Sequence, residues 1–386
     1  MSVSMRCGLA VFLFVLGARS VSAQPSAAAP TARPVYGPED TRADILKRMD
    51  GWLGAMAAAD SFSGVVAVAQ HGKIIWSRAA GIADERTKAA NTVATRFTLA
   101  SMGKMFTATA IAQLVEQGKI SPNDTVGKFL PDFPNRDVAQ RVTIAQLLTH
   151  TSGLGSFWND RYAARRASLL TLADYVPLFA GDPLLFTPGE RWEYSNSGYI
   201  VLGLIIEAVS GMSYYDYVQR HIFDRAGMPN AGYYDRSGTV TNGAVGYTRG
   251  DGAGSPLRDN LGERELRGSS AGGGYASAAD MAAFLEALEK DRLVGARTRE
   301  LFTAGKVDGP FGPKNYGYGF ILRSRADTVV AVGHTGGFPG MTTQAFYYMK
   351  GGYALVVLLN RSGGVVGPVM GETSRAVAAL SARAAQ

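Results

Sequence analysis

The sequence contains a single cysteine among its 386 residues, and this residue, Cys7, lies near the N-terminus. A chain with one thiol cannot form an internal disulfide or assemble a cluster of thiolate metal ligands. Histidine is also scarce, because the 4 histidines are scattered and none lies in a close pattern with carboxylates. This distribution disfavours a zinc site, and we expect neither a metal nor a cofactor.

Charged residues are sparse as well, at 18% of the chain, and the 39 basic and 32 acidic residues are spread along it. Nucleic-acid-binding proteins usually gather basic residues in a stripe, so the sequence disfavours that class of partner. Hydrophobic residues make up 46%, as in globular proteins and unlike disordered chains. The composition therefore indicates a globular protein, which we expect to be a monomer.

The first 23 residues have the pattern of a secretory signal peptide. Arg6 supplies positive charge, residues 8–18 form a short apolar core, and residues 21–23 (Val-Ser-Ala) form a cleavage site. Cys7 precedes the apolar core, which disfavours a lipoprotein anchor, and cleavage removes this thiol and with it any cysteine nucleophile. No later run approaches the roughly 18 apolar residues of a membrane span. We expect a periplasmic or secreted protein without a membrane span after cleavage.

Residues 24–40 are rich in Ala, Pro and Ser and predict a flexible leader, followed by one domain over residues 41–386. The apolar patterning predicts helices over 41–59, 101–117, 199–209 and 367–382 and another from 277, and strands over 63–70, 73–79, 316–322, 328–332, 343–349 and 353–359. Strands thus lie near both ends, with helices between them, mostly in a lobe of roughly 120–300. We expect an α+β fold: an antiparallel sheet built from the N- and C-terminal segments, flanked by helices and carrying a mostly helical insertion.

Ser101 and Lys104 are the first candidate catalytic residues. Residues three apart share one face at the start of a helix, so the hydroxyl and the amine can meet. A serine hydroxyl is a poor nucleophile until a base takes its proton, and a partly desolvated lysine can do so. By itself such a pair is more often a helix-capping serine followed by a surface lysine.

Two further candidate groups lie downstream. Tyr194 and Asn196 stand on a loop leading into the helix over 199–209, where a phenol with a lowered pKa can relay protons and an amide can orient a carbonyl. The second group follows the strand over 328–332 and offers donors and small residues: His334, Thr335, Gly336 and Gly337. Each group alone can be an ordinary loop or strand end.

Together, the three groups resemble the class C β-lactamase-like family of serine hydrolases, which includes D,D-carboxypeptidases, D-aminopeptidases and esterases. The resemblance extends over about 45–385 and includes the stretches 147–154 (LLTHTSGL), 271–274 (AGGG) and 333–337 (GHTGG). It implies an acyl-enzyme on small peptide amides or esters. True β-lactamase activity remains an alternative, as does a catalytically silent binding or sensor protein.

The resemblance also implies a role for each residue. Ser101 is the acylated nucleophile and Lys104 holds or tunes its proton, while Tyr194 is the general base and Asn196 positions the substrate. The N–H groups of Ser101 and Gly337 form the oxyanion hole, and a substrate carboxylate faces His334 and Thr335, beside Gly336.

Histidine at position 334 is a departure from many β-lactamases, which carry lysine there. Its charge is expected to vary near pH 6.5, which favours a peptidase or esterase over an efficient β-lactamase. Among the other polar residues, we expect His150 to be a hydrogen-bonded structural residue, and Tyr316 and Tyr318 to pack within a strand rather than line the substrate site.

Overall fold

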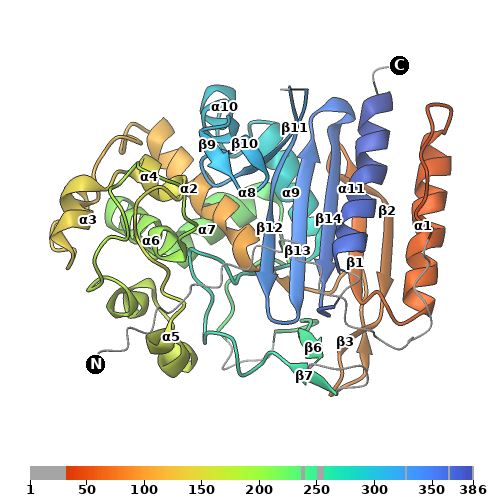
Figure 1. The fold of residues 1–386 in the computed structure, drawn as a ribbon, viewed down its shortest axis with the longest axis horizontal. Helices are drawn as coiled ribbons and strands as arrows, with labels where there is room; N and C mark the ends of the chain where they lie inside the picture. The colour runs from red at the N-terminus through yellow and green to blue at the C-terminus, as the bar shows by residue number, and fades with distance from the viewer. Residues whose placement is uncertain (1–31, 236–239, 250–255, 327, 364–365, 385–386) are drawn as a thin grey trace, which may run out of the picture.

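One antiparallel sheet forms the centre of the computed structural model of the chain, which describes residues 32–235, 240–249, 256–326, 328–363 and 366–384. The sheet has eight strands: β1 (Gly64–Gln70), β2 (Lys73–Ala80), β9 (Val307–Gly309), β10 (Gly312–Tyr316), β11 (Ile321–Arg325), β12 (Thr328–Phe338), β13 (Met341–Tyr348) and β14 (Tyr353–Leu359). Their order is β2-β1-β14-β13-β12-β11-β10-β9, so the N-terminal hairpin pairs with the C-terminal strand (Figure 1). The predicted α+β fold, with a sheet built from both ends of the chain, is confirmed.

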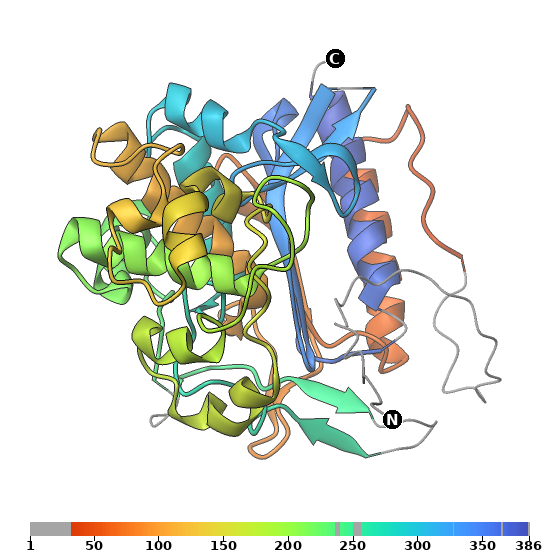
Figure 2. The same ribbon diagram turned by 60° about the vertical axis from the view of Figure 1, so that its left-hand side comes forward.

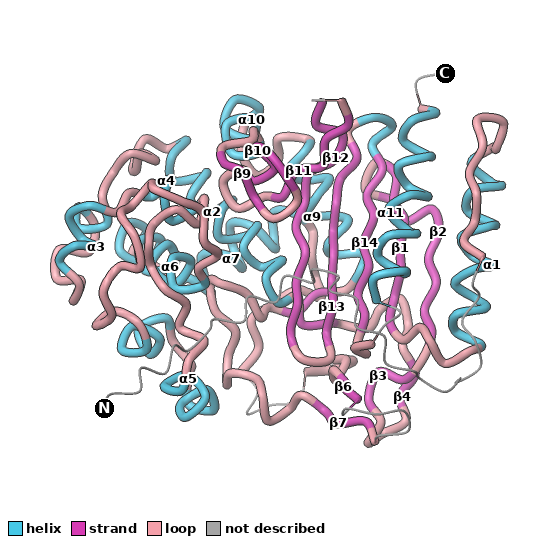
Figure 3. Tube along the Cα trace, viewed as in Figure 1, coloured by secondary structure: helices cyan, strands magenta, loops and turns pink. Residues whose placement is uncertain are grey.

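Helices cover both faces of this sheet. On one face lie α1 (Arg42–Ala58) and α11 (Val366–Arg383), and α9 (Ala278–Glu289) packs on the other, as Figure 2 shows. The remaining α-helices are α2 (Lys104–Glu116), α3 (Arg136–Arg141), α4 (Ile144–Leu148), α5 (Asp160–Arg165), α6 (Asn196–Ser210), α7 (Tyr214–Val218), α8 (Asp224–Ala226) and α10 (Ala296–Thr303). Six short strands lie outside the main sheet: β3 (Ile82–Asp84), β4 (Ala89–Ala90), β5 (Phe97–Thr98), β6 (Tyr247–Arg249), β7 (Leu257–Asp259) and β8 (Tyr275–Ala276) (Figure 3).

The neighbouring interior strands β1 and β14 are apolar because both of their faces are buried. Val65 points into the core shared with α2 and α9, whereas its neighbour Val66 points into the core beneath α1 and α11. Every residue of β14 is buried. A strand covered on both faces has no polar alternation, which explains the continuous apolar runs in the sequence.

Two strand predictions near the C-terminus were wrong in their bounds. The predicted strand 316–322 is two strands, β10 and β11, separated by a turn in which Gly319 has φ +80°. The predicted strand 328–332 continues as β12 to Phe338. His334 and the residues after it therefore lie within a strand paired with β13, not beyond its end.

The N-terminal residues divide into two parts. The predicted signal peptide, residues 1–23, lies outside the described residues. Residues 34–40, from the predicted flexible leader, lie against α1 and α11: Arg48 pairs with Asp40 at 2.6 Å, and Arg375 donates to the Pro34 carbonyl oxygen at 2.6 Å. This part of the leader therefore has a fixed place in the fold.

Among the described residues, no single helix has the length and apolarity to cross a membrane, although the bent pair of α6 and residues Tyr214–Ala226 meets the length and composition test.

Candidate active site

Ser101 lies on a 3₁₀ turn, η1 (Ala100–Gly103), that continues directly into α2. The preceding residue, Ala100, has φ +47°, a left-handed conformation that costs a residue with a Cβ about 1–2 kcal/mol. Neighbouring segments hold this strained turn from two sides, because Gly273 N–H donates to the Ala100 carbonyl oxygen at 3.3 Å and Thr343 Oγ1 donates to that of Leu99 at 3.0 Å. Ser101 is thus fixed on a rigid support.

Two glycines make this close approach possible. A Cβ at Gly272 would lie 2.4 Å from the Ala100 carbonyl oxygen, and one at Gly336 would lie 2.3 Å from the Leu99 carbonyl oxygen. Neither position can hold a side chain without moving η1, the turn that carries Ser101. Gly272 and Gly336, one from each of the stretches 271–274 and 333–337, therefore have a structural reason that the sequence alone does not reveal.

The Lys104 side chain is completely buried and contacts Ser101 and two oxygen acceptors. Its Nζ donates to Asn196 Oδ1 at 2.7 Å and to the Ala271 carbonyl oxygen at 2.6 Å, and lies 3.3 Å from Ser101 Oγ. Burial lowers the pKa of Lys104 well below its usual value. A neutral amine has two hydrogens and one lone pair. In the neutral form that burial favours, the two oxygens accept both hydrogens and the lone pair is left for the Ser101 hydroxyl.

Tyr194 and Asn196 are brought to Lys104 by the start of α6. The Ser195 side chain caps this helix by accepting from Gly198 N–H at 3.1 Å, which fixes the backbone on either side of it. The Lys104 Nζ lies 4.8 Å from the centroid of the Tyr194 ring, and the nearby Ser101 side chain acts to lower the pKa of Tyr194. Burial raises the pKa of Tyr194 by more than the Ser101 side chain lowers it, so the expectation of a lowered phenol pKa was wrong.

Strand β12 contributes the next residues of the site, and the last part of one of its edges is not paired with β11, which we call its open edge. It pairs with β11 only as far as Gly333, whereas β13 pairs with it up to Phe338. The Thr335 carbonyl oxygen points to the open edge, where the His334 ring bonds it at 2.5 Å. Alternate residues of an antiparallel strand point their N–H groups the same way, so Gly337 N–H also points to this edge. That orientation suits an oxyanion donor, and the role itself stays a prediction.

His334 differs most from its expected behaviour. Its side chain is only 2% exposed, and both ring nitrogens are engaged, one by Tyr316 and one by Thr335. Burial, reinforced by the charge of Lys104 when protonated, lowers its pKa to about 3. The expected titration near pH 6.5 is therefore wrong, and His334 is neutral at physiological pH.

Thr335 lies on a different face from the nucleophile turn. It stands opposite Gln344 of β13, whose side chain bonds α11 through the Met370 carbonyl oxygen at 3.2 Å. Residues directly opposite in a sheet share one face, so the Thr335 side chain lies on the α11 side. That Thr335 reads a substrate carboxylate stays a prediction.

The structure adds two residues that the sequence did not place in the site. His150 is fully buried and accepts from Ser195 N–H through Nδ1 at 3.1 Å, which confirms that it is hydrogen-bonded. Its Nε2 lies 3.0 Å from the Tyr316 hydroxyl, which in turn lies 3.1 Å from His334 Nε2. From the sequence, Tyr316 was expected only to pack within a strand together with Tyr318. Its contact with two histidines was not predictable.

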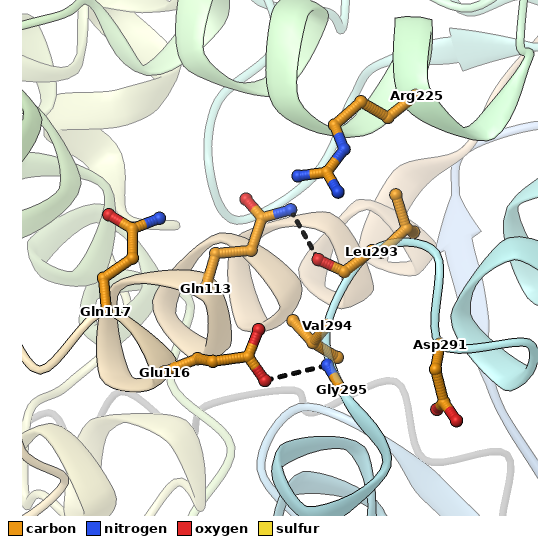
Figure 4. A pocket seen from close by; sticks show the side chains of 8 residues that line it. All are labelled: Gln113, Glu116, Gln117, Arg225, Asp291, Leu293, Val294 and Gly295. Atoms are coloured by element: carbon orange, nitrogen blue, oxygen red, sulfur yellow. Dashed lines mark hydrogen bonds between the residues drawn. The ribbon is translucent and has the colours of Figure 1, made fainter.

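A pocket at the C-terminal end of α2 is lined by residues that hydrogen-bond one another (Figure 4). Gln113 donates to the Leu293 carbonyl oxygen at 3.1 Å, and Glu116 accepts from Gly295 N–H at 2.8 Å. These bonds attach the C-terminal end of α2 to the segment before α10. These hydrogen bonds therefore hold in place the helix that carries Lys104.

Comparison with known proteins agrees with this geometry. The family model described as Beta-lactamase matches residues 12–380. Penicillin-binding protein 4* of Bacillus subtilis is 32% identical over 328 residues, which are 82% of this chain and 72% of that protein.

Solved structures show the same fold. A penicillin-binding protein from Bacillus halodurans has a TM-score of 0.75 at 29% identity, covering 88% of this chain and 100% of that chain. D-amino acid amidase from Ochrobactrum anthropi, solved with L-phenylalanine amide, has a TM-score of 0.72 at 25% identity, covering 88% and 98%. With a buried lysine beside a serine on a rigid turn, the chain belongs to the β-lactamase family and is a serine hydrolase acting on amides or esters.

Proposed function

We propose that the protein is an exported hydrolase of small peptide amides or esters that works through an acyl-enzyme on Ser101. The observation that carries this proposal is the buried Lys104 amine, which donates to Asn196 Oδ1 and the Ala271 carbonyl oxygen and has a pKa well below its usual value. Its lone pair is left for the hydroxyl of Ser101, 3.3 Å away. A buried amine with this arrangement acts as the base that activates serine.

The reaction follows from these contacts. Ser101 Oγ attacks the substrate carbonyl carbon while its proton passes to Lys104 Nζ, and the N–H groups of Ser101 and Gly337 stabilise the oxyanion. The Tyr194 hydroxyl, near the Ser101 side chain, donates its proton to the departing nitrogen or oxygen and regains one from Lys104. Water then attacks the ester by the reverse route and frees Ser101.

The substrate is proposed from the relatives and from His334. A D-amino acid amidase shares the fold, which favours small amides. His334 is buried and neutral, so β12 offers no permanent cation at this position for an anionic drug. β-Lactam hydrolysis remains the second candidate because the relatives include proteins named as penicillin-binding.

A substrate panel with a matched variant tests the proposal. Wild type and Ser101→Ala are assayed on D-amino-acid amides, p-nitrophenyl esters, a D-Ala-D-Ala peptide and nitrocefin, and separate samples of each are labelled with a fluorophosphonate. We expect wild type to label and to turn over amides or esters, and the variant to do neither while melting at the same temperature. Turnover confined to nitrocefin would support a β-lactamase instead, and an unlabelled, inactive wild type would indicate a silent binding protein.

Export and the monomeric state are proposed from the sequence alone. Residues 1–23 have the signal-peptide pattern, so the mature protein is expected to begin at Gln24. N-terminal sequencing of the periplasmic or secreted protein tests the cleavage site, and light scattering of the same sample tests the mass.

A further inference from the structure

A chain of hydrogen bonds connects the loop that carries Tyr194 to strand β12. It runs from the backbone N–H of Ser195 through three side chains, His150, Tyr316 and His334, to the backbone carbonyl oxygen of Thr335. The four contacts measure 3.1, 3.0, 3.1 and 2.5 Å. His150 and Tyr316 are at most 1% exposed and His334 only 2%, so water does not compete for these bonds.

The two ends determine the direction of every bond. A peptide N–H can only donate, so His150 Nδ1 accepts from Ser195 and, in a neutral ring, His150 Nε2 carries the hydrogen. A carbonyl oxygen can only accept, so His334 Nδ1 carries its hydrogen and His334 Nε2 accepts. Tyr316 then accepts from His150 and donates to His334. The two histidines are therefore held in opposite tautomers.

We propose that His150, Tyr316 and His334 are positioning residues, a hydrogen-bonded strut with fixed tautomers that sets the separation between the Tyr194 loop and the open edge of β12. The strut itself is defined by its four hydrogen bonds and does not depend on the proposed reaction. Only its effect on catalysis rests on that proposed function. In that reaction the loop supplies the proton donor and β12 supplies an oxyanion donor. A strut between them fixes the two groups relative to each other.

The strut also requires both rings to be neutral. A proton added to His150 Nδ1 would point at the N–H of Ser195, and one added to His334 Nε2 would point at the Tyr316 hydroxyl, which already accepts from His150. The other titratable groups facing the strut are Lys104 from α2, Tyr194 from the loop and Tyr199 from α6. None is a carboxylate, so none stabilises an added positive charge.

Tautomers can be measured directly on the whole wild-type protein. Long-range ¹H–¹⁵N spectra of ¹⁵N-histidine-labelled protein contain signals from only 4 histidines. We expect one buried ring protonated at Nε2 and another at Nδ1, with neither titrating between pH 5 and 8. Finding both buried rings in one tautomer, or either titrating in that range, would overturn the proposal. Because this measurement needs no substrate, it stays informative if the proposed reaction is wrong.

Tyr316→Phe tests the catalytic consequence, with Tyr318→Phe as the matched control. The first variant removes the central hydroxyl of the strut and keeps the buried ring, whereas Tyr318 is half-buried and packs on Phe302 outside the strut. Misplacing a catalytic group by about 1 Å can cost on the order of 100-fold in rate, so we expect kcat for a p-nitrophenyl ester to fall about 10- to 100-fold in Tyr316→Phe. KM should change by less than about threefold, because the strut does not bind substrate.

The control variant should retain wild-type kcat. The His334 signal should change in Tyr316→Phe and not in Tyr318→Phe, a readout that general destabilisation does not produce in a folded protein. A Tyr316→Phe protein with wild-type kcat and unchanged histidine signals would refute the strut.

Discussion

Replacing Lys104 by methionine removes the base while keeping an unbranched side chain of similar length. The amine lies between the Tyr194 and Tyr199 rings, 4.8 and 5.2 Å from their centroids, so a methionine thioether fills the same apolar space. What disappears is the lone pair 3.3 Å from Ser101 Oγ. Lys104→Met therefore separates proton transfer from packing.

The size of the effect follows from the contacts that are lost. A positioned general base contributes about 10²- to 10⁴-fold in rate, or about 3–5 kcal/mol of barrier at 1.36 kcal/mol per tenfold. The Asn196 and Ala271 oxygens also lose their donor, which costs about 1–3 kcal/mol each in stability when nothing replaces it. Turnover should therefore fall at least 100-fold, with a melting temperature that drops but remains measurable.

The assay is steady-state and burst-phase hydrolysis of p-nitrophenyl acetate by wild type and Lys104→Met, below the melting temperature of the variant. We expect the acylation burst to slow along with kcat, because Lys104 acts in forming the acyl-enzyme. Ser101→Ala serves as the zero-activity reference. A folded Lys104→Met protein with more than a tenth of the wild-type acylation rate would refute the assignment and transfer the role of base to Tyr194.

Two further predictions follow from the pKa directions. Tyr194→Phe should lower turnover about 10²- to 10⁴-fold, because the ring remains and only the proton donor is lost; an effect below about threefold in the same ester assay would contradict that role. Between pH 6.5 and 3 the unfolded chain protonates His334 and the folded chain does not, since its folded pKa is about 3. The free energy of unfolding should thus fall with decreasing pH, by about 1.4 kcal/mol per pH unit from this residue. When this free energy is measured by urea unfolding at several pH values, it should depend less steeply on pH in His334→Gln than in wild type. Equal pH dependence in the two proteins would contradict a neutral buried ring.

Local patterns predicted much of the fold. The helix predicted from residue 277 is α9, which Ser277 and Asp280 cap, and the strands predicted over 63–70 and 73–79 are β1 and β2, joined at His71 and Gly72. The failure at residues 316–322 has a local cause: aromatics at every second position imitate a strand, while Gly319 turns the chain. A Cβ there would lie 2.6 Å from Ala108 Cβ, a clash that depends on a helix distant in sequence.

The site was predictable only where its residues are close in sequence. Ser101 and Lys104 are three residues apart and share one helical turn, so their contact follows from spacing. The acceptors of the Lys104 hydrogens are 92 residues away at Asn196 and 167 residues away at Ala271. The second acceptor is a backbone carbonyl, which any residue could supply, so no residue type signals it. The neutrality of His334 depends on burial, which the histidine itself does not reveal.

The strand order also determines when this enzyme can become active during synthesis. β1 can pair with β14 only after the last strand of the sheet has been synthesised. The turn that carries Ser101 also needs its contacts with Gly272 and Thr343. A nascent chain ending before residue 343 holds the serine and the lysine but not the framework that aligns them. Such end-to-end pairing carries a high loop-closure entropy and slows folding. Catalysis is thus withheld until translation of the sheet is complete.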